Sequence, residues 1–287
     1  MKNEKLPWDE IDSIIARALK EDIGSGDLTT EYFIPSDVVL EAEWVAKEPC
    51  RVAGLPIVDR ILEKLNPQIK SFWAVNDGDC VEGGKFGLVK GPAQDILRAE
   101  RTALNFLQRL SGIATLTAAF VEKVKPYGVK IYDTRKTTPM LRVLEKYAVR
   151  LGGGFNHRMG LNEMVLIKDN HRCVLDSLGI QDWKTSIQHL KKDHPHTQIG
   201  IEVTRSEDVS SAVLLGANFI LLDNMDSEKV RKVVEEWKDK IILEASGGIG
   251  LDQVELYAKT GVDRISIGAL THSVRAINMS LEVLGVV

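Results

Sequence analysis

The fold is indicated by the run Val129-Lys130-Ile131-Tyr132-Asp133-Thr134-Arg135-Lys136. In it a short apolar segment ends in charged residues. From residue 129 onward the chain repeats this form, each apolar segment being followed by a helical pattern. Six strands are expected, at residues 129–132, 164–167, 199–203, 219–222, 241–244 and 264–267. Strands that alternate with helices form parallel β/α units. A complete β/α barrel needs about eight strands, so we predict an incomplete (modified) parallel β/α barrel.

The first part of the chain has a different pattern. Apolar residues at helical spacing predict helices over residues 8–20 and 54–65. Alternation of apolar and polar residues over 40–46 predicts a half-buried strand, and shorter strands are expected at 71–75 and 85–89. This part is therefore α+β.

Two further helices are expected in the middle of the chain. One runs over residues 92–125, and the other begins at Pro139 and ends at Gly152-Gly153-Gly154. On the first of them, one face carries Arg98, Arg101, Asn105 and Gln108. That face is either a solvated surface or a place where Arg101 meets a partner or a ligand.

The amino-acid composition and net charge limit which classes of protein this chain can belong to. The chain has 287 residues, of which 44% are hydrophobic and 27% charged, as in ordinary globular enzymes. No apolar run approaches the roughly 20 residues that cross a membrane, and the polar start is unlike a signal peptide, so we expect a cytoplasmic protein that binds no membrane. A net charge of −4 argues against nucleic-acid binding. Cys50, Cys80 and Cys173 show neither zinc spacing nor a disulfide framework.

Positive charge is concentrated in one stretch. Residues 129–171 contain eight Lys and Arg against four Asp and Glu, in a chain whose net charge is −4. Local positive charge at strand ends suits a small polyanionic substrate.

The residues that end the predicted strands are the candidates for chemistry, because barrel active sites lie at the carboxyl ends of strands. They are Arg135, Lys136, Lys168, Glu202, Asp223, Glu244 with Ser246, and Gly268. One charged strand end is usually just solvated, but consecutive strands ending this way indicate a site. Small residues also follow the last two strands, at Ser246-Gly247-Gly248 and at Gly268 to His272. Together these segments favour phosphate binding through backbone N–H groups.

Motifs along nearly the whole chain resemble the quinolinate phosphoribosyltransferase family, also called carboxylating nicotinate-nucleotide pyrophosphorylase. They are residues 21–30, 100–105, 111–115, 133–139, 152–160, 168–171, 222–225 and 246–248. One departure is Met140, where the family pattern has glycine after the proline. We expect an N-terminal α+β sandwich domain over residues 1–113 and an α/β barrel catalytic domain over 114–273. A C-terminal helix over 274–287 is expected to pack back on the first domain.

The resemblance implies a reaction: quinolinate and phosphoribosyl pyrophosphate give nicotinate mononucleotide, pyrophosphate and carbon dioxide, with Mg²⁺, in NAD biosynthesis. It implies a quinolinate pocket made by Arg135, His157 and Arg158, with Arg101 reaching in from the other subunit of a homodimer.

The resemblance also implies roles for the remaining site residues. Lys136 and Lys168 would lie between the quinolinate and phosphate sites. Glu202 and Asp223 would serve the ribose and the magnesium-bound pyrophosphate, touching the metal indirectly through water and pyrophosphate. The 5′-phosphate end would be held by Ser246, Gly247, Gly248, Gly268 and His272.

Three alternatives remain open at this point. The nearest is a paralogous phosphoribosyltransferase-like protein, of the molybdenum-transport-associated type, with another acceptor. A Schiff-base aldolase could use Lys136 or Lys168 as its nucleophile. A regulatory protein could bind phosphorylated metabolites without turnover.

Overall fold

The structure is a computed structural model that describes residues 6–180 and 183–287. The chain divides into two compact units. The first comprises Met1–Ala118, Thr138–Gly153 and Ser273–Val287, and the second comprises Ala119–Thr137 and Gly154–His272. The first unit thus draws on three parts of the sequence. The domain boundary after residue 113 stays a prediction.

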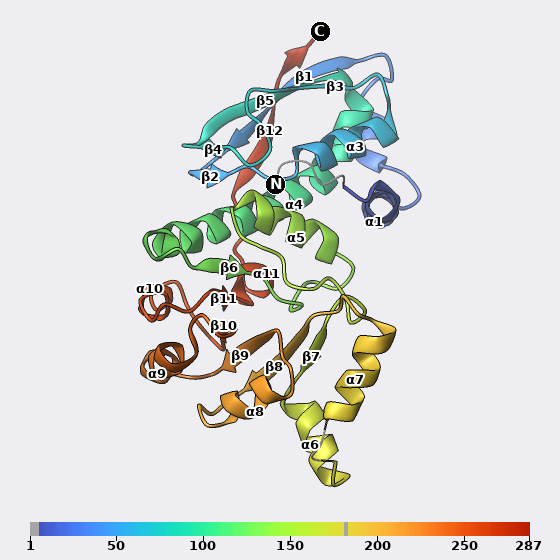
Figure 1. The fold of residues 1–287 in the computed structure, drawn as a ribbon. Coiled ribbons are helices and arrows are strands. Elements are labelled where there is room, and N and C mark those ends of the chain that lie inside the picture. Colours follow the sequence, from blue (N-terminus) through green and yellow to red (C-terminus); the bar gives the residue numbers. More distant parts are fainter. Residues whose placement is uncertain (1–5, 181–182) are drawn as a thin grey trace. The chain divides into compact units, whose positions relative to one another are not determined.

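An antiparallel sheet is the centre of the first unit (Figure 1). Its strand order is β12-β1-β5-β3, with β1 (Val39–Ala46), β3 (Lys70–Trp73), β5 (Gly84–Pro92) and β12 (Met279–Val286). Leu40, Ala42 and Trp44 of β1 are buried, so the predicted alternation is confirmed. Two short strands, β2 (Cys50–Arg51) and β4 (Cys80–Val81), form a separate ladder.

The predicted helices of the first part of the chain are also confirmed. They are α1 (Trp8–Ile23), α3 (Leu55–Leu65) and α4 (Ala93–Val124), and a short α2 (Leu28–Phe33) lies between the first two. Asp27 caps α2 by accepting a hydrogen bond from the Thr30 backbone N–H at 3.0 Å. A 3₁₀ turn, η1 (Lys125–Tyr127), follows α4.

The expected C-terminal helix over 274–287 is wrong, because the chain forms strand β12 there. Met279, Leu281 and Val283 pair with alternate residues of β1 in antiparallel register. Strand β1 offers its outer edge, and pairing satisfies backbone groups that a helix would have satisfied internally. The segment does return to the first unit, as a sheet edge.

The expected start of a helix at Pro139 is also wrong, since α5 is Arg142–Leu151. Met140 has a φ of 68°, which is left-handed and interrupts a helix. The Leu141 backbone N–H donates to the Thr138 carbonyl at 3.1 Å, forming a turn before the helix. The glycine that the family pattern has at position 140 would adopt this φ without strain.

The second unit contains a six-stranded parallel sheet, in the order β6-β11-β10-β9-β8-β7. The strands are β6 (Lys130–Tyr132), β7 (Val165–Ile167), β8 (Ile199–Val203), β9 (Phe219–Asp223), β10 (Ile242–Ser246) and β11 (Arg264–Ser266). All six predicted strands are present, which confirms the fold class. Within residues 6–180 and 183–287, no ladder joins β6 to β7, so the sheet stays open.

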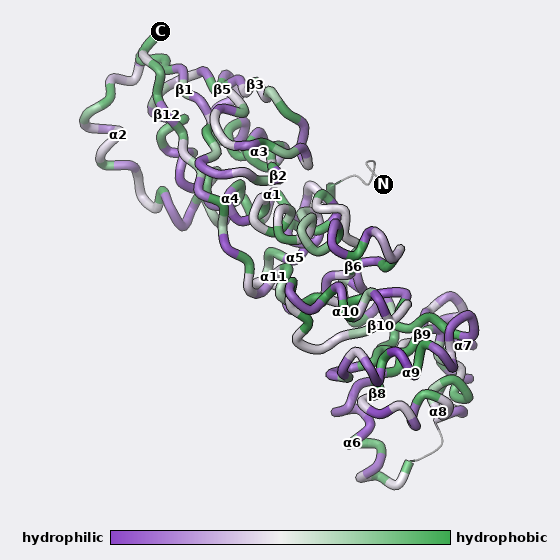
Figure 2. Tube along the Cα trace, turned by 90° about the vertical axis from the view of Figure 1, so that its left-hand side faces the viewer, coloured by the Kyte–Doolittle hydropathy of each residue, from purple (hydrophilic) through white to green (hydrophobic). Residues whose placement is uncertain are grey.

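Helices α7 (Lys184–Asp193), α8 (Asp208–Leu214), α9 (Ser227–Trp237) and α10 (Val254–Ala258) lie around this sheet (Figure 1). Two more, α6 (Asp169–Ser177) and α11 (Ala269–His272), follow the carboxyl ends of β7 and β11. All five residues of β8 are buried, and β9 is drawn as a hydrophobic segment in Figure 2. Among the described residues, none of the helices is both long and apolar enough to span a bilayer.

Candidate active site

The carboxyl edge of the parallel sheet collects the predicted residues of the second unit. Because all six strands run in one direction, their ends meet at the same edge. The residues there are Arg135 and Lys136 after β6, Lys168 after β7, Glu202 in β8, Asp223 at the end of β9, Ser246 at the end of β10 and Gly268 after β11. Arg101 lies in the first unit, exposed on α4.

Two carboxylates and two lysines form one cluster at this edge. The Lys168 Nζ lies 2.5 Å from Glu202 Oε2, and Glu202 is only 5% exposed. Burial raises the pKa of Asp223, and the nearby negative charge of Glu202 raises it further. The charges of Lys168 and Lys136 act in the opposite direction. The cluster therefore holds two carboxylates that interact with each other, with cations beside both.

Asn224 positions Asp223 and was not among the site residues predicted from the sequence. Its side-chain amide donates to Asp223 Oδ2 at 2.6 Å, and its backbone N–H donates to the Ser246 carbonyl at 2.9 Å. Asn224 has a φ of 54°, a region that Asn enters more readily than most residues. A Cβ at Gly247 would lie 2.6 Å from the Asn224 nitrogen, so only glycine allows this approach. An Asn after a strand-ending Asp was the available signal.

Glycines follow the last two strands of the parallel sheet, at Gly247, Gly248 and Gly268. Gly247 and Gly248 both have positive φ, at 105° and 63°. A Cβ at Gly268 would lie 3.0 Å from His272 Nε2 and 3.1 Å from Lys136 Cδ. The Thr271 hydroxyl donates to the Lys136 carbonyl at 2.8 Å. Lys136 and His272 therefore meet beside a residue that has no side chain.

A second cluster contains the predicted quinolinate residues. Arg158 is 9% exposed, and its guanidinium donates to the Met164 carbonyl at 2.7 Å. Burial lowers the pKa of Arg158, and the positive charge of Arg135 lowers it further. Two guanidinium groups that repel each other across a partly buried site favour an anion between them.

Asp133 attaches the loop that carries His157 and Arg158 to β6. Its carboxylate is fully buried and accepts hydrogen bonds from the His157 backbone N–H at 2.8 Å and from the Asn156 amide at 2.6 Å. The Phe155 N–H donates to the Ile131 carbonyl at 2.8 Å. Asp133 was predicted only as part of a motif, because its partners lie more than twenty residues further along the chain.

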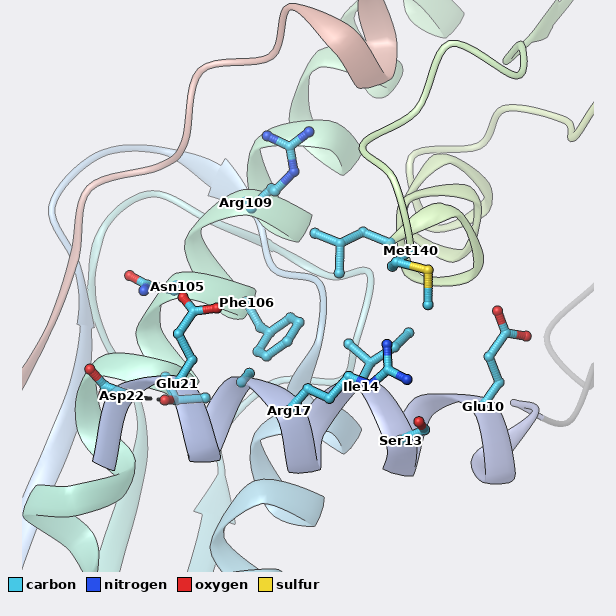
Figure 3. A pocket seen from close by; sticks show the side chains of 13 residues that line it. Glu10, Ser13, Ile14, Arg17, Glu21, Asp22, Asn105, Phe106, Arg109 and Met140 are labelled. Atoms are coloured by element: carbon cyan, nitrogen blue, oxygen red, sulfur yellow. Dashed lines mark hydrogen bonds between the residues drawn. The ribbon is translucent and has the colours of Figure 1, made fainter. Parts of the chain in front are cut away.

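A cavity of about 550 Å³ lies in the first unit, between α1, α4 and the turn before α5 (Figure 3). Apolar side chains such as Ile14, Phe106 and Met140 line it, together with the charged residues Arg17 and Glu21. The Thr102 hydroxyl donates a hydrogen bond to Asp22 Oδ2 at 3.3 Å. None of the predicted substrate residues lines this cavity.

Comparison with known proteins supplies the family. Residues 27–111 match the quinolinate phosphoribosyl transferase N-terminal domain, and residues 113–282 match its C-terminal domain. A mitochondrial quinolinate phosphoribosyltransferase [decarboxylating] of Nicotiana tabacum is 41% identical over 296 residues, covering 96% of this chain and 83% of the relative. A probable nicotinate-nucleotide pyrophosphorylase [carboxylating] of Methanothermobacter thermautotrophicus is 38% identical, covering 95% of this chain and 98% of the relative.

Solved structures agree with these relatives. The nicotinate-nucleotide pyrophosphorylase of Francisella tularensis superposes with a TM-score of 0.89 at 36% identity, covering 97% of this chain and 98% of that one. The enzyme of the same name from Ehrlichia chaffeensis gives a TM-score of 0.88 at 36% identity, covering 99% and 100%. With both domain models matched along the chain, this protein belongs to the quinolinate phosphoribosyltransferase family.

Proposed function

We propose that this protein transfers the phosphoribosyl group of phosphoribosyl pyrophosphate to quinolinate with loss of carbon dioxide, giving nicotinate mononucleotide and pyrophosphate in NAD biosynthesis. Its relatives carry names for this activity. The observation that carries the proposal is the carboxyl edge of the second unit. There a Lys168–Glu202–Asp223 cluster lies at the ends of strands of one parallel sheet, and Arg135, which follows β6, interacts with the guanidinium of Arg158 in a neighbouring loop.

The guanidinium pair suits the dicarboxylate. Quinolinate carries two carboxylates, and each arginine can hold one with two parallel hydrogen bonds. Arg135 and Arg158 supply the positive charge, and His157 lies next to Arg158 in the same loop. Burial of Arg158 strengthens its attraction for an anion, because the surroundings screen charge less than water does.

The carboxylate cluster suits the sugar. As the bond between the anomeric carbon and pyrophosphate breaks, positive charge develops on the ribose ring, and Glu202 and Asp223 can stabilise it. Lys136 and Lys168 stabilise the leaving oxygen. The quinolinate nitrogen forms the new bond to the anomeric carbon. The resulting pyridinium accepts the electron pair of the breaking carbon–carboxylate bond, carbon dioxide leaves, and the ring carbon takes a proton.

Magnesium fits the donor atoms at this edge. Mg²⁺ prefers hard oxygen ligands and is usually held by one or two carboxylates together with substrate phosphates and water. Within the described residues, no group of three or more His, Cys, Asp or Glu could hold a metal ion. Glu202 and Asp223 would therefore hold it through water and pyrophosphate, and the ion would neutralise the leaving group. Chelation should abolish turnover while quinolinate binding, measured by calorimetry without the sugar substrate, persists.

The 5′-phosphate is proposed to bind beside the last two strands. Ser246, Gly247 and Gly248 present hydroxyl and backbone groups after β10, and Gly268 gives His272 and Lys136 room to approach each other. Backbone N–H groups in positive-φ turns commonly bind phosphate oxygens.

Arg101 is proposed to act in the site of the other subunit of a homodimer. Its exposure on α4 leaves it accessible to a partner. Mixed dimers of Arg101→Ala and Lys168→Ala subunits test this. If Arg101 acts across the interface, one site of each mixed dimer is intact and activity returns. If Arg101 acts within its own subunit, the mixed dimers stay inactive.

One assay tests the reaction: release of carbon dioxide that depends on quinolinate, phosphoribosyl pyrophosphate and Mg²⁺ together. A paralogous transferase would release pyrophosphate with another acceptor, an aldolase would be trapped by borohydride, and a binding protein would show no turnover. A cytoplasmic location stays a prediction, since plant relatives carry mitochondrial and chloroplastic names.

A further inference from the structure

Glu244 is a buried carboxylate in the second unit that the proposed mechanism does not use. It lies in β10 and is 0% exposed. Its Oε1 accepts a hydrogen bond from the Ser266 hydroxyl of the neighbouring strand β11. Its Oε2 has no hydrogen-bond partner in the part of the chain that the structure describes. A buried carboxylate costs free energy unless its surroundings compensate for it, so the groups that face it matter.

Two cationic or ionisable side chains lie close to Glu244. The His157 Nε2 lies 3.6 Å from Oε1, and the Arg264 guanidinium lies 3.8 Å from Oε2. Burial raises the pKa of Glu244, while the Ser266 hydrogen bond and the charges of Arg264 and Lys168 lower it. Glu244 therefore lies beside His157, one of the residues assigned to quinolinate.

The imidazole of His157 is held from three sides. Its Nδ1 accepts a hydrogen bond from the Arg158 backbone N–H at 2.9 Å, so Nδ1 carries no proton and the ring proton is assigned to Nε2. Nε2 faces Glu244. The ring meets Phe219 edge-on, with centroids 6.1 Å apart and planes at 73°. The side chain is only 8% exposed, so the ring has little room to turn.

Arg264 completes this arrangement from the other side of Glu244. Its guanidinium stacks over the rings of Tyr132, at 5.1 Å, and Phe219, at 5.5 Å. Phe219 thus contacts both Arg264 and His157, the two side chains that flank the carboxylate. The packing of Arg264 against Phe219 and Tyr132 therefore restricts the position of the guanidinium that faces the Glu244 carboxylate.

We propose that Glu244 is a positioning residue for quinolinate: its carboxylate, 3.6 Å from His157 Nε2, attracts the N–H at that atom electrostatically, favours that tautomer, and so holds the adjacent Arg158 in place to receive a carboxylate. This inference rests on the proposed function. A ring with the other tautomer would turn an N–H toward the Arg158 backbone N–H, and this loop would have to shift. A displacement of about 1 Å at a binding group can cost up to ~100-fold in activity.

The test compares three variants. Glu244→Ala removes the acceptor, and Glu244→Gln keeps an oxygen for Ser266 and His157 but loses the charge. Asp263→Ala is the matched control, because Asp263, directly before β11, accepts a hydrogen bond from the Leu243 N–H of β10 at 2.8 Å. The readouts are the KM for each substrate, kcat, and the ¹⁵N resonances of the His157 ring, assigned with His157→Gln.

We expect Glu244→Ala to raise the quinolinate KM about tenfold and to leave the phosphoribosyl pyrophosphate KM unchanged. Its His157 Nδ1 signal should move toward that of a mixture of tautomers. Glu244→Gln should give a smaller rise, and Asp263→Ala should change neither the KM ratio nor the ring signals. If Glu244→Ala does not fold, Glu244→Gln against Asp263→Asn carries the same comparison.

Two results overturn the inference. The first is spectroscopic: the wild-type His157 ring carries its proton on Nδ1, or the ring signals do not change in the Glu244 variants. The second is kinetic: the KM values for quinolinate and phosphoribosyl pyrophosphate change equally, and the Glu244 variants behave like the Asp263 variants. Absence of quinolinate-dependent carbon dioxide release by the wild-type protein is a different outcome, because it refutes the proposed function while the ring signals still report on Glu244.

Discussion

Arg135, His157 and Arg158, here called the dicarboxylate half, lie on loops, whereas Glu202 and Asp223, the ribose half, lie in strands of the parallel sheet. Ladder hydrogen bonds hold Glu202 in β8 and Asp223 in β9, and the Asn224 amide also donates to Asp223. The loops depend instead on buried carboxylates, Asp133 and, in the inference above, Glu244. Loop residues of a site are therefore only as rigid as the polar groups beneath them.

The largest effect should come from the ribose half. Glu202→Gln removes the charge that stabilises positive ribose, and we expect kcat to fall by about 100- to 1,000-fold, as when one group aimed at transition-state charge is lost. Quinolinate affinity should remain, since Glu202 belongs to the ribose half. Steady-state carbon dioxide release and calorimetry measure the two quantities. Normal kcat, or a loss confined to quinolinate binding, would contradict the division into halves.

The next effect should come from the dicarboxylate half. Arg158→Ala or Arg135→Ala removes charge-assisted hydrogen bonds and should weaken quinolinate binding by about 10- to 100-fold. Arg158→Lys is the control, because it keeps the charge and loses the planar fork. It should recover only part of the affinity. Calorimetric affinity for quinolinate that is unchanged in both alanine variants would exclude this assignment.

A smaller effect is expected beneath the loop. In Asp133→Asn, one N–H of the amide faces a donor, so the variant should lose about 1–3 kcal/mol of unfolding free energy. The KM for quinolinate should rise in this variant, while the KM for phosphoribosyl pyrophosphate stays constant. Asp226→Asn is a fitting control, because Asp226 caps α9 by accepting from the Lys229 N–H at 2.8 Å and Asn caps helices equally well. Urea-induced unfolding of both variants measures the difference.

The smallest effect should come from a residue outside both halves. Met140 adopts a φ of 68°, which costs a side-chain residue about 1–2 kcal/mol. Met140→Gly relieves this strain and so stabilises the folded protein. Glycine also makes the unfolded chain more flexible, which opposes folding, so the net gain in unfolding free energy should be ~1 kcal/mol or less. Leu161→Gly, at an exposed position without positive φ, should destabilise instead. Neither variant should change a KM.

Sequence patterns predicted the strands because periodicity is a local property. Strand β8 was predicted with the bounds that the structure has, and β9 extends one residue further to include Asp223. The segment after Ile277 was misread as a helix because its pairing partner, β1, lies more than 200 residues earlier. The helix after Pro139 was placed too early because a left-handed Met140 has no signature in apolar spacing.

The sequence by itself determined which charged residues end strands, since a strand-ending Lys168 or Asp223 follows from local pattern and from the shared direction of parallel strands. Only the tertiary structure decided which buried groups support them. Asp133 meets His157 and Asn156, and Glu244 meets Ser266 and His157, across separations of 22 to 87 residues that no local pattern encodes. Hydrogen bonds and burial depend on three-dimensional proximity, and proximity over such separations arises only when the strands assemble into a sheet.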